Sequence, residues 1–187
     1  MRKWMLIASV GVVSIVCLGT KAGYVRPSLE ELMKRVPASP TEHCAIDEGL
    51  EDTSCTPGLP LTTSKSDICN NVSTKTVRPP SEYTDALKKA QIIEYGFTDT
   101  DPRDYEEDHL ISLEIGGHPD DPKNLWPEPH EGAYGSVVKD KVENWLHKEI
   151  CSGAMTPEEA QKGIVEDWRQ YIDQANAATH RKVKEVE

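Results

Sequence analysis

Apolar residues recur at helical spacing in two stretches of the first hundred residues. The run Ser28–Val36 carries Leu29, Leu32 and Met33 on one face and predicts a short helix with Ser28 as N-cap. The run Ser81–Tyr95 predicts a longer helix that Ser81 can cap. Its apolar side is made by Tyr83, Leu87, Ala90, Ile92 and Ile93. The rest of residues 24–80 is rich in Pro, Ser, Thr and Gly, and residues 37–66 are typical of a loop.

Between residues 105 and 150 the pattern changes to strand, turn, strand and helix. Residues 105–115 predict a strand or tight hairpin arm, and Gly116-Gly117 predicts a turn. Residues 124–127 predict a short second strand, stopped by Pro127 and Pro129. A helix over residues 139–150 would turn apolar side chains inward, namely Val138, Val142, Trp145 and Leu146. This order predicts a β-β-α unit with flanking helices, in an α+β fold with a mostly helical C-terminal part.

The C-terminal part begins with a strong helix signal. Thr156-Pro157-Glu158-Glu159 is a capping box with proline at the first helical position. It predicts a last helix to about Ala177. The inward side chains of this helix would be Ala160, Ile164, Trp168 and Ile172. The charged tail after it, residues 179–187, is expected to fray.

The first 22 residues have the pattern of a secretory signal peptide. Arg2 and Lys3 precede an apolar run over residues 4–18, and Thr20-Lys21-Ala22 offers a cleavage site. The run is short for a membrane span, which needs about 20 apolar residues. We expect an exported protein, secreted or periplasmic, with no stable membrane association after cleavage. The alternative is an uncleaved leader that anchors the N-terminus in a membrane.

Cysteine usage agrees with export. Once the leader and its Cys17 are removed, four cysteines remain: Cys44, Cys55, Cys69 and Cys151. An even set in an exported chain predicts two disulfides, with three possible connectivities. We favour Cys44–Cys55 and Cys69–Cys151 because the first two share one loop-like segment. A zinc site is the alternative, but the chain has no CxxC pair.

The charge of the chain limits the kind of nucleic-acid partner it can have. The net charge is −11, and removing Arg2, Lys3 and Lys21 with the leader leaves 18 basic and 32 acidic residues, or −14. Phosphate neutralisation by basic residues supplies much of the affinity of nucleic-acid binders. The balance therefore argues against tight, sequence-specific DNA binding, while a nuclease that grips locally through a metal ion stays compatible with it.

The strand around residue 108 carries the candidate chemistry. Phosphodiester hydrolysis needs an activated water and positive charge on the phosphate, which a neutral histidine and a divalent ion with oxygen ligands provide. In this interpretation His109 is the general base and Asp108 holds the metal. Asn124 follows from the facing strand, either as an amide ligand or as a clamp on the loop. A histidine that merely fills a strand is the plainer alternative, but the Gly-Gly turn, Asn124 and the following helix favour a site.

These motifs resemble the HNH (His-Me finger) endonucleases, specifically small exported or phage-type members. Those read YExDHLIPLELGG, then NLWP, then KDxxE on a helix, then a Cys-Ser-Gly turn. The matching positions are Tyr105–Gly117, Asn124–Pro127, Lys139–Glu143 and Cys151–Gly153. The resemblance covers roughly residues 66–170. It implies a β-β-α metal core and a metal-dependent endonuclease of low sequence specificity, acting on DNA rather than RNA. Mg²⁺ is the expected ion, with Mn²⁺ or Zn²⁺ as alternatives.

The resemblance also divides the chain into parts. A loop-rich N-terminal segment, residues 23–65, follows the leader and has no counterpart in the family. The nuclease-like domain covers residues 66–178.

The chain departs from the family at the third metal ligand. Ala133 stands where the third histidine is usual, so the ligand must come from elsewhere. The candidates are His130, Glu143, Asn144 and His147. Asp140, Glu143, Asn144 and His147 share one helical face by spacing, and we take His147 as the working third ligand. The alternative for this face is a solvated charged surface.

Other charged residues near the motif keep two interpretations. Glu106 and Glu114 could orient His109 or an arginine, or could be exposed strand acids. Arg78, Arg103 and Lys139 could contact phosphate, or could be solvated surface residues. The acidic surface and the missing histidine also favour a second hypothesis for the whole chain. This is an exported binding protein that retains the scaffold without turnover.

Overall fold

The computed structural model describes residues 24–70 and 74–184, with backbone alone from residue 180. The predicted leader, residues 1–22, lies outside the described residues. Within the described part, no helix is long and apolar enough to cross a membrane. The fold is α+β, about half helical, with one small antiparallel sheet of two strands.

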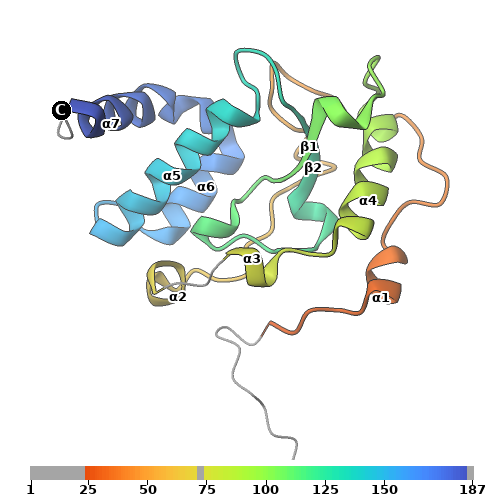
Figure 1. Ribbon diagram of the computed structural model, residues 1–187, viewed down its shortest axis with the longest axis horizontal. Helices are drawn as coiled ribbons and strands as arrows, with labels where there is room; N and C mark the ends of the chain where they lie inside the picture. The colour runs from red at the N-terminus through yellow and green to blue at the C-terminus, as the bar shows by residue number, and fades with distance from the viewer. Residues whose placement is uncertain (1–23, 71–73, 185–187) are drawn as a thin grey trace, which may run out of the picture.

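The two strands stand between two groups of helices. In Figure 1, α4 lies on one side of β1 and β2, while α5, α6 and α7 lie together on the other side. The bounds are α1 Leu29–Met33, α2 Lys65–Cys69, α3 Thr74–Val77, α4 Ser81–Glu94, β1 Tyr105–His109, β2 Leu125–Pro129, α5 Ser136–Ser152, α6 Pro157–Asp167 and α7 Ile172–Lys184. Short 3-10 helices are η2 Pro102–Asp104, η3 Leu113–Ile115, η4 Pro122–Asn124 and η5 Trp168–Tyr171.

Local side-chain caps begin two of the predicted helices. Ser28 starts α1 through a capping box with Glu31, and Thr156 starts α6 through one with Glu159. The prediction for α4 is wrong at its first residue. Pro80 is the N-cap and makes no side-chain cap bond, so Ser81 is already inside the helix.

The predicted last helix is in fact three elements. Asp167 has an extended backbone with φ −172° and ψ 95°, which ends α6, and its carboxylate accepts a hydrogen bond from the Arg169 N–H. The 3-10 helix η5 follows, and α7 then runs to Lys184, beyond the predicted end at Ala177. The break turns the chain so that α7 packs on α5.

The sheet also differs from the sequence pattern. The first strand ends at His109, because residues 110–112 turn and Ser112 caps η3 with its hydroxyl. In β2, Pro127 and Pro129 lie inside the strand and pair with Glu107 and Tyr105. Prolines are tolerated there because each strand of a two-stranded sheet has one edge without a partner strand. A proline can face its nitrogen to that edge, where no N–H is needed for pairing.

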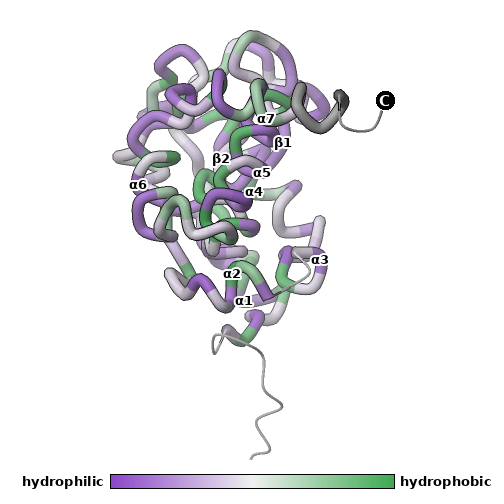
Figure 2. Tube along the Cα trace, turned by 90° about the vertical axis from the view of Figure 1, so that its left-hand side faces the viewer, coloured by the Kyte–Doolittle hydropathy of each residue, from purple (hydrophilic) through white to green (hydrophobic). Residues whose placement is uncertain are grey.

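The largest apolar cluster lies between η3 and the C-terminal helices. Its fully buried members include Ile115, Val142, Leu146, Ile150, Ile164 and Trp168. Figure 2 shows apolar positions gathered inward and hydrophilic positions along the outer turns of the helices. Burial of such side chains is the main favourable contribution to folding.

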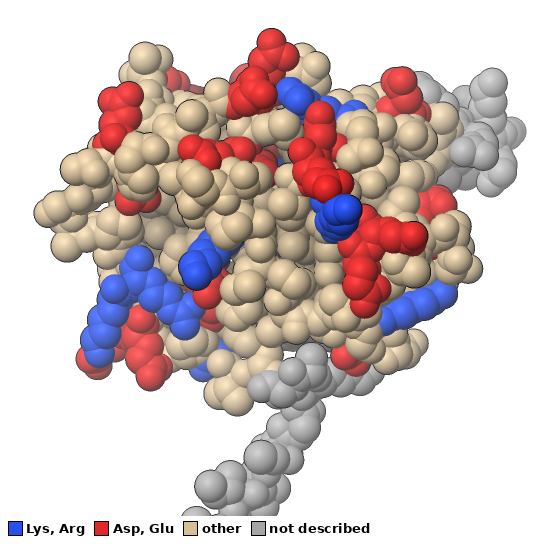
Figure 3. Space-filling view, turned by 180° about the vertical axis from the view of Figure 1, so that it is seen from behind, with Lys and Arg blue, Asp and Glu red and all other residues tan. Residues whose placement is uncertain are grey.

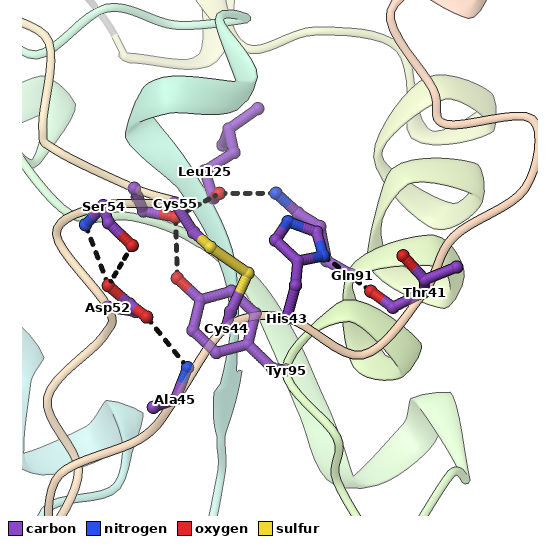
Figure 4. Close-up of a disulfide and its surroundings, with 11 residues drawn as sticks. Thr41, His43, Cys44, Ala45, Asp52, Ser54, Cys55, Gln91, Tyr95 and Leu125 are labelled. Atoms are coloured by element: carbon purple, nitrogen blue, oxygen red, sulfur yellow. Dashed lines mark hydrogen bonds between the residues drawn. A yellow bond between two sulfur atoms is a disulfide. The ribbon is translucent and has the colours of Figure 1, made fainter.

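Both predicted disulfides are present. Cys69–Cys151 joins the end of α2 to α5 across 82 residues of sequence. Cys44–Cys55 spans 11 residues and packs on Tyr95 and Trp126, so that it anchors the N-terminal loop beside β2. Figure 4 shows this disulfide, with the Gln91 amide reaching the Leu125 carbonyl close by.

Candidate active site

Asn124 is a fully buried clamp on the loop that follows β1. Its Oδ1 accepts hydrogen bonds from the N–H of Ile111 at 2.9 Å and of Leu59 at 3.2 Å. Its Nδ2 donates to the carbonyl oxygens of Ile111 at 3.0 Å and His118 at 2.9 Å. The carboxamide thus has both donors and both lone pairs engaged by backbone, as an asparagine with four partners can. This geometry matches the clamp rather than the amide ligand.

The turn at Gly116-Gly117 requires glycine at both positions, because no other side chain fits there. Gly116 has φ +93°, in the left-handed region that favours glycine. At Gly117 a Cβ would stand 1.7 Å from the Ile111 carbonyl oxygen and 3.0 Å from Asn124 Nδ2. The close approach lets Asn124 span the loop, and the Leu59–Pro60 segment pairs with the same turn.

His109 ends β1, and its ring points into the interior, with only 3% of the residue exposed. Its Nε2 lies 2.9 Å from the Pro119 carbonyl oxygen. A carbonyl only accepts, so Nε2 carries the proton and Nδ1 keeps its lone pair in the neutral ring. Burial lowers the pKa of His109 to about 4, against the opposing effects of the Asp108 carboxylate and the Pro119 carbonyl. The ring is therefore neutral at pH 7.

Asp108 points to the other face of the strand and meets α5. Its carboxylate accepts a hydrogen bond from the Lys139 ammonium, which also bonds the Glu143 carboxylate and, at 3.0 Å, the His109 carbonyl oxygen. Burial would lower the pKa of Lys139, but the acids around it outweigh burial and raise that pKa. Burial likewise opposes ionisation of Asp108, yet Lys139 and His109 hold its pKa below the usual range. The interpretation of Lys139 as a solvated surface residue is wrong, since 1% of it is exposed.

Two further acids share this interior. Glu128, opposite Glu106 in the sheet, is 1% exposed, and neither of its carboxylate oxygens has a hydrogen-bond partner among the described residues. Burial raises the pKa of Glu128 well above its ordinary value, with nearby Asp108 adding to the rise. Burial also raises the pKa of Glu143 to about 8 and that of Glu51 to about 7. Lys139 thus favours the ionised form of Asp108, while burial shifts Glu128, Glu143 and Glu51 toward the protonated form.

The candidate third ligands lie apart from this centre. His147 Nδ1 is 2.7 Å from the Glu114 carbonyl oxygen, and its Nε2 is 3.7 Å from Cys151 Sγ, beside the second disulfide. Asn144 is exposed and donates to the Asp140 carbonyl oxygen at 2.7 Å. His130 Nδ1 lies 3.2 Å from the Ser136 hydroxyl. The structure thus joins Asp108 to Lys139 and Glu143, and it directs His147 elsewhere.

Among the described residues, one group of three side chains is close enough together to hold a metal ion. His43, Cys44 and Cys55 have ligand atoms within 4.8 Å of one another. Both sulfurs are bonded to each other in the disulfide of Figure 4, so they are not available as thiolates. This group lies with the N-terminal disulfide and not with Asp108.

The two arginines considered as phosphate contacts, Arg78 and Arg103, lie in different places. The Arg78 guanidinium is close enough to lower the pKa of His109, whereas Arg103 is exposed and pairs with Asp101. On the face shown in Figure 3, the Lys and Arg side chains stand in small separate groups interrupted by acids. This face offers no continuous basic track for a nucleic-acid backbone.

Sequence reasoning missed Glu51 and Glu128. Glu128 had a usable signal, because its place two residues after Trp126 puts both side chains on one face of the sheet, where Glu128 is paired directly with Glu106. Glu51 had none, since it comes from an irregular loop. Comparisons with family models, with curated proteins and with solved structures found no match.

Proposed function

We propose that this protein is an exported, metal-dependent endonuclease that hydrolyses phosphodiester bonds of nucleic acid. The observation that carries the proposal is the end of β1, where a neutral histidine with an oriented ring adjoins an ionised aspartate under a helix. A β-β-α order surrounds this pair: β1, β2 and α5. The same pair stands in the motif that resembles the HNH endonucleases.

In this proposal His109 takes the proton from the attacking water. The Pro119 carbonyl fixes the proton on Nε2, so that Nδ1 is the basic atom. A ring that is neutral at pH 7 can accept a proton without first losing one. Removing the imidazole therefore removes the base while leaving the Asp108 pair with Lys139 in place.

The residues present fit a hard divalent cation. Glu128 supplies a buried carboxyl group that no N–H donor of the described residues reaches and that lies within hydrogen-bonding reach of the Asp108 carboxylate, so a cation between the two acids would be favourable. Carboxylate oxygens suit Mg²⁺ or Mn²⁺ better than Zn²⁺. Asp108, Glu128 and Glu143 would hold the ion only after displacement of the Lys139 ammonium, which bonds both Asp108 and Glu143, because these three acids are not a preformed ligand group. Such an ion supplies positive charge that polarises the phosphate. Asn124 and His147 are engaged elsewhere and are not needed in this ligand set.

The substrate of this proposal is DNA, cut with little sequence preference. The acidic chain and the scattered basic groups of Figure 3 do not supply the phosphate contacts that tight binding requires. Arg78, near His109, is the cation best placed to meet a phosphate at the site. A protein that grips locally in this way would cut many sequences slowly.

The test is nicking of supercoiled plasmid by the oxidised protein in Mg²⁺ or Mn²⁺, with EDTA as a blank. His109→Ala should abolish nicking. His43→Ala is the matched control, because His43 is exposed and its ring bonds the Thr41 carbonyl oxygen, away from Asp108. Nicking by His109→Ala at the rate of the unchanged protein would refute the role of the base. Absence of nicking by the unchanged, folded protein would refute the endonuclease for DNA, and RNA would be tried next.

One observation favours a second candidate, the non-catalytic binding protein. His109 is 3% exposed, and the Lys139 ammonium already neutralises Asp108. A protein that keeps the scaffold only for stability would show this closed centre. It would bind no divalent cation, so calorimetry with Mn²⁺ separates the two candidates without any substrate.

A further inference from the structure

The loop that orients His109 is held by the first described residues of the chain. The Pro119 carbonyl that accepts from His109 is followed directly by Asp120, which is fully buried. Arg35, just after α1, places its Nη1 2.9 Å from Asp120 Oδ1 and 3.0 Å from the Asp120 carbonyl oxygen. The Tyr24 hydroxyl donates to the other carboxylate oxygen.

Other contacts leave this loop little freedom. The Tyr83 hydroxyl of α4 donates to the Asp120 carbonyl oxygen at 2.9 Å. The His118 ring packs edge-on against the Tyr24 ring at 5.9 Å, and its Nδ1 accepts from the Asp121 N–H at 3.2 Å. The loop is thus held by α4 on one side and by the N-terminal segment on the other.

The buried charge of Asp120 needs the N-terminal segment, because that segment supplies the cation that pairs with it. A carboxylate with no exposed surface is strongly unfavourable unless a cation and hydrogen bonds compensate it. Arg35 is the cation that the structure provides, and its side chain stays 33% exposed while that of Asp120 is 0% exposed. Without Arg35 and Tyr24, the carboxylate would turn toward water and carry the adjoining Pro119 carbonyl with it.

We propose that Asp120 is a positioning residue for His109, and that Arg35 and Tyr24 set its position. The N-terminal segment, residues 24–36, has no counterpart in the family that residues 66–170 resemble. It acts on the site through one peptide unit, since Asp120 fixes the Pro119 carbonyl and that carbonyl fixes the His109 ring. The catalytic consequence rests on the proposed function, while the orientation of the ring does not.

The first experiment measures the ring itself, in the oxidised full chain without metal. The His109 Nε2 proton, held by the Pro119 carbonyl, should exchange slowly with water and be visible by ¹⁵N NMR. Arg35→Met should speed its exchange by about tenfold or more, as expected when a charge-assisted hydrogen bond to a buried carboxylate is lost. Arg35→Lys should restore part of the protection, because it returns the charge. Lys34→Met is the control, since Lys34 is exposed and pairs with exposed Glu30.

The second experiment measures plasmid nicking by the same variants. Arg35→Met should lower kcat by about tenfold and leave KM nearly unchanged, because the base is displaced while the substrate surface is not. Tyr24→Phe removes one hydroxyl and serves if Arg35→Met does not fold. A His109 ring proton as well protected in these folded variants as in the unchanged protein would overturn the proposal. Altered ring exchange in a protein that never nicks would uphold the positioning and reject the nuclease instead.

Discussion

Replacing Asn124 by alanine should lower the free energy of unfolding by about 3–5 kcal/mol, with or without a divalent cation. The side chain makes four buried hydrogen bonds to backbone groups. Each such bond contributes about 0.5–1.5 kcal/mol net, and unpaired partners left in the interior add their own desolvation cost. At about 1 kcal/mol for each of the four bonds, the loss is about 4 kcal/mol, within the expected 3–5 kcal/mol.

The aspartate variant separates the clamp from the metal ligand. Asn124→Asp keeps an oxygen for the N–H groups of Leu59 and Ile111 but loses both donors. It also places a negative charge against the carbonyl oxygens of Ile111 and His118. A clamp should therefore lose about 2–4 kcal/mol. A metal ligand would tolerate the change, because a carboxylate oxygen binds Mg²⁺ at least as well as an amide oxygen.

The assay is urea unfolding followed by tryptophan fluorescence, in EDTA and again in Mg²⁺. Asn144→Ala is the matched control, since Asn144 is exposed on α5 and makes one hydrogen bond to the Asp140 carbonyl oxygen. It should change stability by less than about 0.5 kcal/mol. Losses below about 1 kcal/mol for both Asn124 variants in EDTA, with Mg²⁺ binding abolished by Asn124→Ala and kept by Asn124→Asp, would refute the clamp.

Three further outcomes follow from the geometry. Gly117→Ala should lower the free energy of unfolding by about 3 kcal/mol, because its Cβ would stand 1.7 Å from the Ile111 carbonyl oxygen. Gly132→Ala is the control and should lower it by about 1–2 kcal/mol, since φ is +107° there but nothing lies within 4 Å. Equal losses for the two variants in urea unfolding would contradict the close approach at Gly117. Glu51, whose pKa burial raises from 4.5 to about 7, contributes stability that is present below pH 4.5 and lost as pH rises to about 7. Glu51→Gln should therefore match the unchanged protein near pH 4.5 and exceed its unfolding free energy at pH 8.5 by up to about 3 kcal/mol, and a gain independent of pH would reject this account. Replacing Cys69 and Cys151 by serine opens a loop of 82 residues and should lower the free energy of unfolding by about 4.5 kcal/mol, against about 2.8 kcal/mol for Cys44 and Cys55, which close a loop of 11. Thermal unfolding of the two double-serine variants measures both losses, and a larger loss for the Cys44–Cys55 pair would contradict this account.

The parts of the fold that could be predicted are those fixed by neighbours in sequence. Capping is a local exchange between a side chain and the backbone three residues on, so the pattern revealed the N-cap at Ser28 and the capping box at Thr156; the box that Ser28 makes with Glu31 was added by the structure. The break at Asp167 was missed, because the apolar spacing continues through it. The extended backbone of Asp167 ends α6, and the spacing of apolar residues carries no information about that conformation.

The site shows the same division. Asp108, His109 and Asn124 were recognised because they lie in one short motif. The burial of Lys139 depends on Asp108, 31 residues away, so the sequence pattern left it as a surface cation. His147 shares its helical face with Glu143 by spacing alone, yet its ring bonds the Glu114 carbonyl oxygen. Spacing on a helix gives the face, and only the packing of the whole domain decides what that face meets.

The pairing of Arg35 with Asp120 also bears on the order in which the molecule is assembled. A ribosome makes Arg35 85 residues before Asp120, which at about 5–20 residues per second is about 4–17 s. During that interval α1, five residues long, is too short to persist as a helix by itself. The beginning of the chain therefore cannot make this contact until the middle of the chain has been made. Until then the His109 loop lacks this contact, so the pairing of Arg35 with Asp120 also sets the earliest time at which the loop is held from both sides.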